Sequence, residues 1–162
     1  MASKPPPLPD HQPDPSVSDS KGCQKCKAKK CTFCTTHLQV TNTFISVRSK
    51  HTFKIRHAFT CQSRNLVYLL DCRKCANMQY VGETGQKLKD RITQHRSDIR
   101  TNKETLVAKH FNRNNHTVDD LACTAIEQIR STNIEVRKQQ EKKWRYKLRT
   151  HYPDGLNVWD SV

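Results

Sequence analysis

The sequence has no long apolar run and few acidic side chains. No stretch of its 162 residues approaches the roughly 18 consecutive apolar residues of a membrane span, and the region after Met1 lacks the apolar run of a secretory signal. We therefore expect a soluble, intracellular protein without a membrane partner. Only 15 Asp and Glu residues stand against 29 Lys and Arg residues, which gives a formal net charge of +14. This excess favours a polyanionic partner, above all nucleic acid in the nucleus, because neutralised phosphates release their counterions.

The chain is long enough for one ordinary domain and a tail, since domains commonly hold roughly 100–150 residues. Residues 1–21 are rich in proline, serine and aspartate and contain almost nothing apolar to bury, which predicts a disordered tail. We interpret residues 22–61 as a basic, cysteine-rich linker and residues 62–162 as the domain.

Hydrophobic periodicity predicts an α+β domain with a small antiparallel three-stranded sheet flanked by helices. Two short runs of strand-forming residues, separated by a few polar residues, indicate a hairpin. In chain order, the expected elements are strands over residues 66–70 and 78–82, a helix after residue 85, a helix over 105–111, a strand over 121–129 and a helix over 134–148.

Several side chains of this domain are candidates for chemistry, although each has an ordinary structural explanation. Glu141 is the single acid between Arg137 and Arg149, a stretch with seven basic residues, and steps of three and four place it on the apolar stripe of the last helix. On spacing alone, a salt bridge to Arg137 or Arg145 is the better explanation of this residue. Tyr68 and Tyr80 in the two strands could simply pack in the core.

Taken in order, these residues resemble the GIY-YIG nuclease family. The resemblance spans residues 66–157, and it departs from the family pattern where Leu66 replaces the glycine of the first motif. The residues that carry it are Val67 and Tyr68 in the first strand, Tyr80, Val81 and Gly82 in the second, Arg91 and Glu141 on successive helices, and Asn157 near the end.

The resemblance implies a metal-dependent endonuclease that cuts a strand of DNA. Glu141 would hold one Mg²⁺ or Mn²⁺ ion, which carboxylate oxygen suits. Tyr68 would act as general base, with its proton affinity lowered by the surrounding positive field, while Tyr80 orients the attacking water. Arg91 would stabilise the charge that develops on the phosphate, and His95 would assist it. Gly82 and Asn157 would support the site.

Further motifs resemble the endonuclease domain of Penelope-like retroelements. They are the CxxC of Cys72 and Cys75, the histidines His95, His110 and His116, and the segments 141–144, 147–150 and 153–157. This resemblance implies that the cut frees a 3′ hydroxyl that primes reverse transcription. This chain has no room for a reverse transcriptase, so it would be a fragment, a decayed copy or a standalone host protein, and a reverse transcriptase or another retroelement component could be a partner.

The cysteines favour zinc, because eight cysteines without a secretory signal indicate metal ligands rather than disulfides. Cys72 and Cys75 could share one zinc ion at the hairpin tip, with His110 and His116 as the other two ligands of a closed structural site. Unligated surface thiols are the alternative.

Two more CxxC pairs near the amino terminus predict a second zinc site, although only four residues separate the pairs. His37 or Cys61 could replace one ligand, and a flexible basic linker is the alternative. The four cysteines are Cys23, Cys26, Cys31 and Cys34.

The remaining basic side chains would contact phosphates of the DNA backbone. Such contacts position a duplex without reading its sequence. The side chains singled out are Lys87, Lys89, Lys142, Lys143, Arg145 and Lys147. Three other functions fit parts of the sequence: a structure-specific repair nuclease, a zinc-bearing nucleic-acid-binding protein that does not cut, and an interaction protein.

Overall fold

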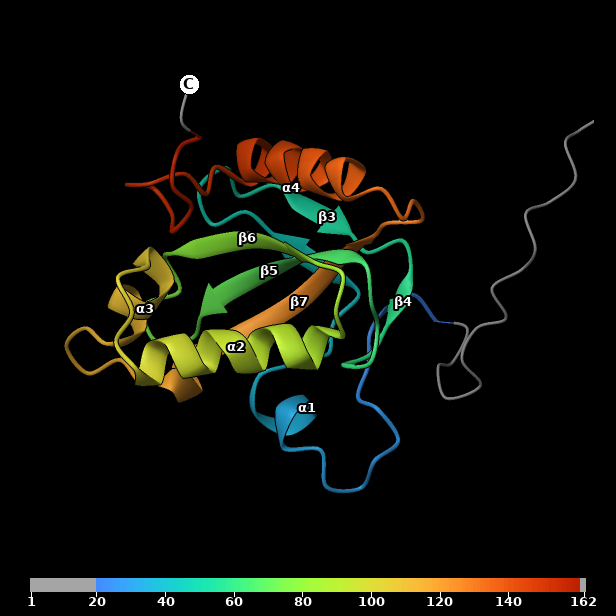
Figure 1. The fold of residues 1–162 in the computed structure, drawn as a ribbon, viewed down its shortest axis with the longest axis horizontal. Coiled ribbons are helices and arrows are strands. Elements are labelled where there is room, and N and C mark those ends of the chain that lie inside the picture. The colour runs from blue at the N-terminus through green and yellow to red at the C-terminus, as the bar shows by residue number, and fades with distance from the viewer. Residues whose placement is uncertain (1–19, 161–162) are drawn as a thin grey trace, which may run out of the picture.

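A three-stranded antiparallel sheet forms the centre of the computed structural model, which describes residues 20–160 (Figure 1). The disorder expected for residues 1–19 concerns residues outside that range. Strand β5 (Leu66–Cys72) lies between β6 (Gln79–Thr84) and β7 (Leu121–Gln128). The apolar run that begins β5 is buried on both faces, which explains why this segment reads as a continuous hydrophobic stretch rather than an alternating one.

Helices α2 (Leu88–Arg100) and α3 (Leu106–Phe111) cover one side of the sheet (Figure 1). The stripe of Leu88, Ile92, His95 and Ile99 is the buried face of α2, as its three-and-four spacing requires. The side chain of Thr105 accepts a hydrogen bond from the amide of Ala108 and caps α3. A short 3₁₀ helix, η1 (Val118–Asp120), then leads into β7.

Helix α4 (Ile134–Leu148) lies on the opposite side of the sheet and packs mainly against the edge strand β6 (Figure 1). Asn133 caps its start by accepting a hydrogen bond from the amide of Glu135. The helix ends where Arg149 adopts a left-handed conformation with φ of 55°.

The amino-terminal part of the described chain packs on the same core. Strand β1 (Gly22–Cys23) pairs in parallel with β4 (Ala58–Phe59), helix α1 (Thr32–Thr36) follows β1, and β2 (Thr43–Ile45) forms a hairpin with β3 (Thr52–Lys54). The rings of Phe44 and Phe53 lie 5.3 and 5.2 Å from that of Trp144 in α4. The division of the chain at residue 62 stays a prediction, but residues 22–61 contribute buried side chains to one continuous core.

The predicted α+β class and the sheet flanked by helices are confirmed. The last helix covers the predicted residues, and β7 ends one residue early, at Gln128. Within residues 20–160, no helix has the length and apolar character needed to cross a membrane.

Candidate active site

Three aromatic side chains meet on the α2 side of the sheet. The strand register places Tyr68 opposite Gly82 and Tyr80 opposite Leu70, so both tyrosines point to the same face. The hydroxyl of Tyr68 lies 2.7 Å from Nε2 of His95, and the Tyr80 ring centre lies 5.5 Å from that of His95. The fully buried Tyr68 is therefore fixed by one directed hydrogen bond and by packing between a strand and a helix.

Gly82 makes the position of Tyr68 geometrically feasible. A Cβ atom at residue 82 would lie 2.3 Å from both Cζ and Oη of Tyr68, which is far inside van der Waals contact. The glycine of the second strand is thus needed for a close approach and not for an unusual backbone angle.

Burial is the largest cause of the pKa shifts of Tyr68 and His95. Burial and the charge of Arg91 lower the pKa of His95 to about 3, so its imidazole is neutral near pH 7. Burial also raises the pKa of Tyr68 well above its ordinary value, with Tyr80 adding to the effect and Arg91 opposing it. The expected lowering of the proton affinity of Tyr68 by a positive field is therefore not met, because desolvation outweighs the single nearby arginine.

Glu141 is buried on α4, and one of its two oxygens is occupied. Nε and Nη2 of Arg145 donate to Oε1 at 2.8 and 2.5 Å, so the salt bridge considered from helical spacing exists with Arg145. Arg137 pairs with Glu83 instead. Among the described residues, none donates a hydrogen bond to Oε2, which leaves that oxygen able to bind a cation. Burial raises the pKa of Glu141, and Arg145 opposes this rise.

Arg91 and Glu141 both lie close enough to the two tyrosines to influence them electrostatically. The charges of Arg91 and Glu141 shift the pKa values of both Tyr68 and Tyr80, in opposite directions. The Arg91 side chain is half-buried and donates from Nη1 to Oε1 of Gln94 at 3.0 Å. A pocket of about 490 Å³ opens beside Glu141, and Glu83, Lys142, Arg145 and Asp160 are among the residues that line it.

Asn157 connects the end of the chain to the strand that carries Tyr80. Its Oδ1 accepts from the amide of Val81 at 2.8 Å and from the hydroxyl of Thr150 at 2.7 Å. Its Nδ2 donates to the carbonyl of Val81 at 2.9 Å. This buried amide fixes the backbone next to Tyr80, consistent with the supporting role predicted for it.

The four predicted zinc ligands at the hairpin tip converge. The ligand atoms of Cys72, Cys75, His110 and His116 all lie within 4.8 Å of one another, and Sγ of Cys75 is 3.6 Å from Nε2 of His110. Nε2 of His116 is buried and faces the Cys75 thiol, so it lies where a zinc ligand is needed. The donor set of two thiols and two imidazoles fits zinc.

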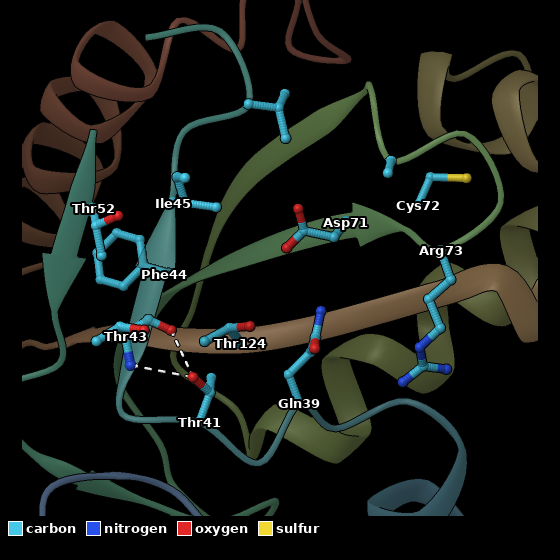
Figure 2. A pocket seen from close by; sticks show the side chains of 12 residues that line it. Gln39, Thr41, Thr43, Phe44, Ile45, Thr52, Asp71, Cys72, Arg73 and Thr124 are labelled. Atoms are coloured by element: carbon cyan, nitrogen blue, oxygen red, sulfur yellow. Dashed lines mark hydrogen bonds between the residues drawn. The ribbon is translucent and has the colours of Figure 1, made fainter. Parts of the chain in front are cut away.

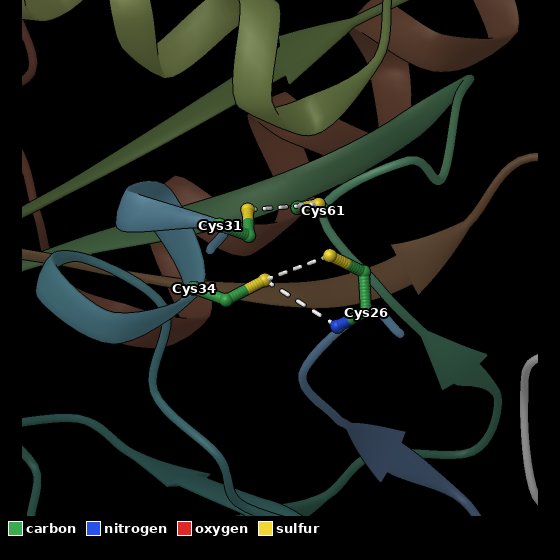
Figure 3. A group of neighbouring side chains, drawn as sticks. All are labelled: Cys26, Cys31, Cys34 and Cys61. Carbon is green, nitrogen blue, oxygen red and sulfur yellow. Dashed lines mark hydrogen bonds between the residues drawn. The ribbon is translucent and has the colours of Figure 1, made fainter. Parts of the chain in front are cut away.

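A second cluster consists of Cys26, Cys31, Cys34 and Cys61 (Figure 3). The Sγ atoms of Cys31 and Cys61 are 3.9 Å apart, and those of Cys26 and Cys34 are 3.7 Å apart. A tetrahedral site with zinc–sulfur bonds of about 2.3 Å needs sulfur separations of about 3.8 Å. The cluster is therefore compatible with zinc.

Two of the ligands considered for this second cluster lie elsewhere. The sulfur of Cys23 contacts the backbone of Ala125, at 3.3 Å from the amide and 3.4 Å from the carbonyl. Nδ1 of His37 lies 2.7 Å from the carbonyl oxygen of Leu121. Pairing of β1 with β4 turns Cys23 into the core, and Cys61 replaces it as the fourth member.

The basic side chains predicted to contact DNA lie in or next to two helices. Lys87 directly precedes α2 and Lys89 lies in its first turn, while the remaining ones lie along α4. The ammonium of Lys147 lies 4.8 Å above the ring of Trp144, and Arg145 differs from the others because it is engaged with Glu141.

A larger pocket, of about 560 Å³, was not anticipated from the sequence (Figure 2). Asp71, Phe44, Thr41 and Thr124 are among the residues that line it. Asp71 follows Leu70 in β5 and so points to the face opposite the tyrosines. Burial raises the pKa of Asp71 to about 6, against the hydrogen bond from Gln79. This pocket is separate from the tyrosine cluster.

Comparison with known proteins identifies the fold. No protein-family model and no curated protein matches the chain. The solved structure of the catalytic domain of the homing endonuclease I-TevI is similar, with a TM-score of 0.50 and 18% sequence identity over 60% of this chain and 100% of that one. At this identity the likeness concerns the fold, and it confirms the GIY-YIG nuclease-like architecture expected from the sequence.

Proposed function

We propose that this protein is a divalent-metal-dependent endonuclease that cuts one strand of DNA by attack of water on a phosphodiester. The hydrogen bond between Tyr68 and His95, formed beside Tyr80 and within the field of Arg91 and Glu141, carries the proposal. The likeness of the fold to a homing endonuclease catalytic domain supports it. The net charge of +14 suits a DNA substrate.

Tyr68 and His95 prepare the attacking water in this proposal. We assign the phenol as the donor of their hydrogen bond, which corresponds to the tautomer of the neutral imidazole that carries its proton on Nδ1 and accepts at Nε2. The Tyr68 oxygen presents lone pairs that accept a hydrogen bond from water. As the water attacks, its proton passes to this oxygen while the phenol proton passes to Nε2 of His95. Tyr80, on the same face of the neighbouring strand, orients that water.

Glu141 and Arg91 act on the phosphate at which the strand is cut. Oε2 of Glu141 would hold the Mg²⁺ or Mn²⁺ ion, which supplies Lewis-acid stabilisation of the phosphate and of the leaving 3′ oxygen when bound. The guanidinium of Arg91 carries a permanent charge and a planar set of donors that suit phosphate oxygens. Arg145 holds Oε1 and thereby fixes the carboxylate.

The two cysteine-containing clusters are structural zinc sites in the same proposal. Each offers four protein ligands, which leaves no coordination position for substrate. The site of Cys72, Cys75, His110 and His116 ties the tip of the tyrosine hairpin to α3 and the turn that follows it.

The biological setting is a further part of the proposal. The sequence motifs favour a retroelement-derived nuclease in the nucleus, whose nick leaves a 3′ hydroxyl that primes a separate reverse transcriptase. Comparing nicking rates on linear, flap and four-way-junction DNA tests this origin, because a clear preference for branched DNA would favour a repair nuclease.

Nicking of supercoiled plasmid tests the catalytic proposal. We expect Glu141→Gln to bind DNA nearly as well as the parent and to lose about 100-fold or more of its magnesium-dependent nicking. Glu104→Gln is the matched control, because Glu104 is 90% exposed and pairs with Lys109, which is not among the predicted site residues, and it should nick normally. Undiminished nicking by Glu141→Gln would refute the metal-binding role.

A further inference from the structure

The end of the described chain lies along α4, beside the candidate active site. We call residues 157–160 the C-terminal strap. Asn157 anchors one end of the strap to β6 through Val81. Trp159 anchors the other end, because its indole stacks on His151 at a centroid distance of 3.9 Å and donates from Nε1 to the carbonyl of Tyr152 at 2.9 Å. The strap is therefore held by directed contacts although Trp159 is largely exposed.

These anchors place the carboxylate of Asp160 on two cations of α4. Its Oδ1 lies 3.1 Å from Nη1 of Arg145, and its Oδ2 lies 3.4 Å from Nζ of Lys142. Arg145 is the same guanidinium that holds Glu141. Asp160 also lines the pocket that opens beside Glu141. An anion of the protein itself thus sits next to the group proposed to bind the metal.

The Asp160 carboxylate places one oxygen on each of two cations. A phosphate bound through its two non-bridging oxygens would make the same pair of contacts. The Asp160 side chain is 48% exposed and that of Lys142 is 55% exposed, so water and ions reach this pair. Exposed ion pairs of this kind contribute little to stability. The Asp160–Lys142 pair is therefore weak. An arriving phosphate that takes over both cations also has to offset the pair with Arg145, whose side chain is 17% exposed, and the contacts of Trp159.

We infer that Lys142 and Arg145 form a subsite for a phosphate of the DNA strand that flanks the cut, and that the C-terminal strap occupies this subsite until DNA displaces it. The inference rests on DNA being the substrate, as proposed above. In this inference the Asp160 carboxylate competes with a DNA phosphate for Lys142 and Arg145. The strap would then move away from the pocket beside Glu141 when DNA binds.

Removal of the competing charge tests the inference. The measurement is equilibrium binding of duplex DNA by the zinc-loaded protein at low salt, without added magnesium, so that no cleavage is needed. We expect Asp160→Asn to bind on the order of two- to fivefold more tightly than the parent. Its affinity should also fall more steeply with salt, because freed Lys142 and Arg145 then carry counterions that DNA releases.

Two further variants separate displacement from a general change in charge. Asp154→Asn makes the same charge change on an exposed residue before the strap, and it should give a smaller gain. Trp159→Ala changes no charge but loosens the strap, and it should tighten DNA binding as Asp160→Asn does. In a Lys142→Ala background, the gain from Asp160→Asn should shrink, because one of the two cations is missing.

Several results would overturn the inference. They are equal gains for Asp160→Asn and Asp154→Asn, weaker binding by Trp159→Ala, or a full gain in the Lys142→Ala background. A protein that gains affinity as expected but does not nick DNA would refute the proposed nuclease activity and leave the phosphate subsite standing.

Discussion

The candidate site depends on Gly82 because glycine has no side chain. The ring of Tyr68 fills the space in which a Cβ atom of residue 82 would lie. The backbone angles of Gly82 are open to other residues, so the constraint is contact alone. The position of the tyrosine hydroxyl, and with it the hydrogen bond to His95, is therefore set from the neighbouring strand.

Gly82→Ala should displace Tyr68 and reduce plasmid nicking by more than about tenfold, because small misplacement of catalytic groups is costly. Overpacking should also lower the free energy of unfolding by about 1–3 kcal/mol, which denaturant titration measures. Gly85→Ala is the control, since its new methyl group would meet the Arg137 guanidinium at 2.8 Å, which tests overpacking away from Tyr68. Equal nicking by both variants would contradict this view of the site.

His95 should make stability depend on pH. Its pKa is lowered to about 3 in the folded protein, so the unfolded chain takes up the proton first as the pH falls below about 6.5. The stability contributed by the neutral histidine is therefore complete at higher pH and is lost as the pH falls toward 3. Asp71, whose pKa is raised to about 6, acts in the opposite direction, so a variant comparison is needed.

The comparison is between the parent and His95→Gln. Between pH 7.5 and 5.5, the parent should lose about 1 kcal/mol more of its free energy of unfolding than the variant. Denaturant titrations in the presence of zinc measure this difference. The same loss in both proteins would mean that His95 already takes up a proton in the fold.

At the scale of elements, the sequence predicts what depends on local spacing. The bounds of α4 match those predicted from an apolar stripe that ends at Leu148, and the structure adds Asn133 as the cap of its start. The CxxC of Cys72 and Cys75 marks the tip of the tyrosine hairpin in the same way. Local spacing does not predict which side chains distant segments bring to a site. The clearest case is the choice between Cys23 and Cys61 as the fourth member of the second cysteine cluster. That choice depends on the pairing of β1 with β4.

Cys61 also links the second cysteine cluster to α2. Its carbonyl oxygen accepts a hydrogen bond from the amide of Lys89 at 3.0 Å, in the first turn of the helix that carries Arg91. A metal held by Cys61 would therefore fix the amino-terminal loop and the start of α2 relative to each other.

Metal analysis tests this link directly. The parent should contain about two equivalents of zinc, and Cys61→Ser should contain about one and melt at a lower temperature. Cys23→Ser is the control, because serine can replace the hydrogen bonds of that thiol with Ala125, and it should keep both equivalents. Loss of zinc from Cys23→Ser but not from Cys61→Ser would reverse the assignment.

At the scale of the whole molecule, elements on both sides of the sheet contribute to the candidate site, because α4 supplies Glu141. The side covered by α2 holds the tyrosines and His95, whereas the other side is closed by α4 and the hairpin of β2 and β3 (Figure 1). This hairpin comes from the segment interpreted as a linker. Its contact with α4 joins residues about 100 positions apart, which no local pattern in the sequence reveals.

Phe44→Ala tests whether that hairpin and the domain unfold together. Phe44 is buried and lies against Phe53 and Trp144, so its truncation should lower the free energy of unfolding by about 3–5 kcal/mol. Because Trp144 belongs to α4, tryptophan fluorescence and far-ultraviolet circular dichroism should shift to the same lower midpoint in one transition. Val40→Ala, at a residue that is 58% exposed, should leave the midpoint unchanged. If circular dichroism instead kept the midpoint of the parent while the fluorescence transition moved alone, the hairpin would be an appendage and the core would begin near residue 62.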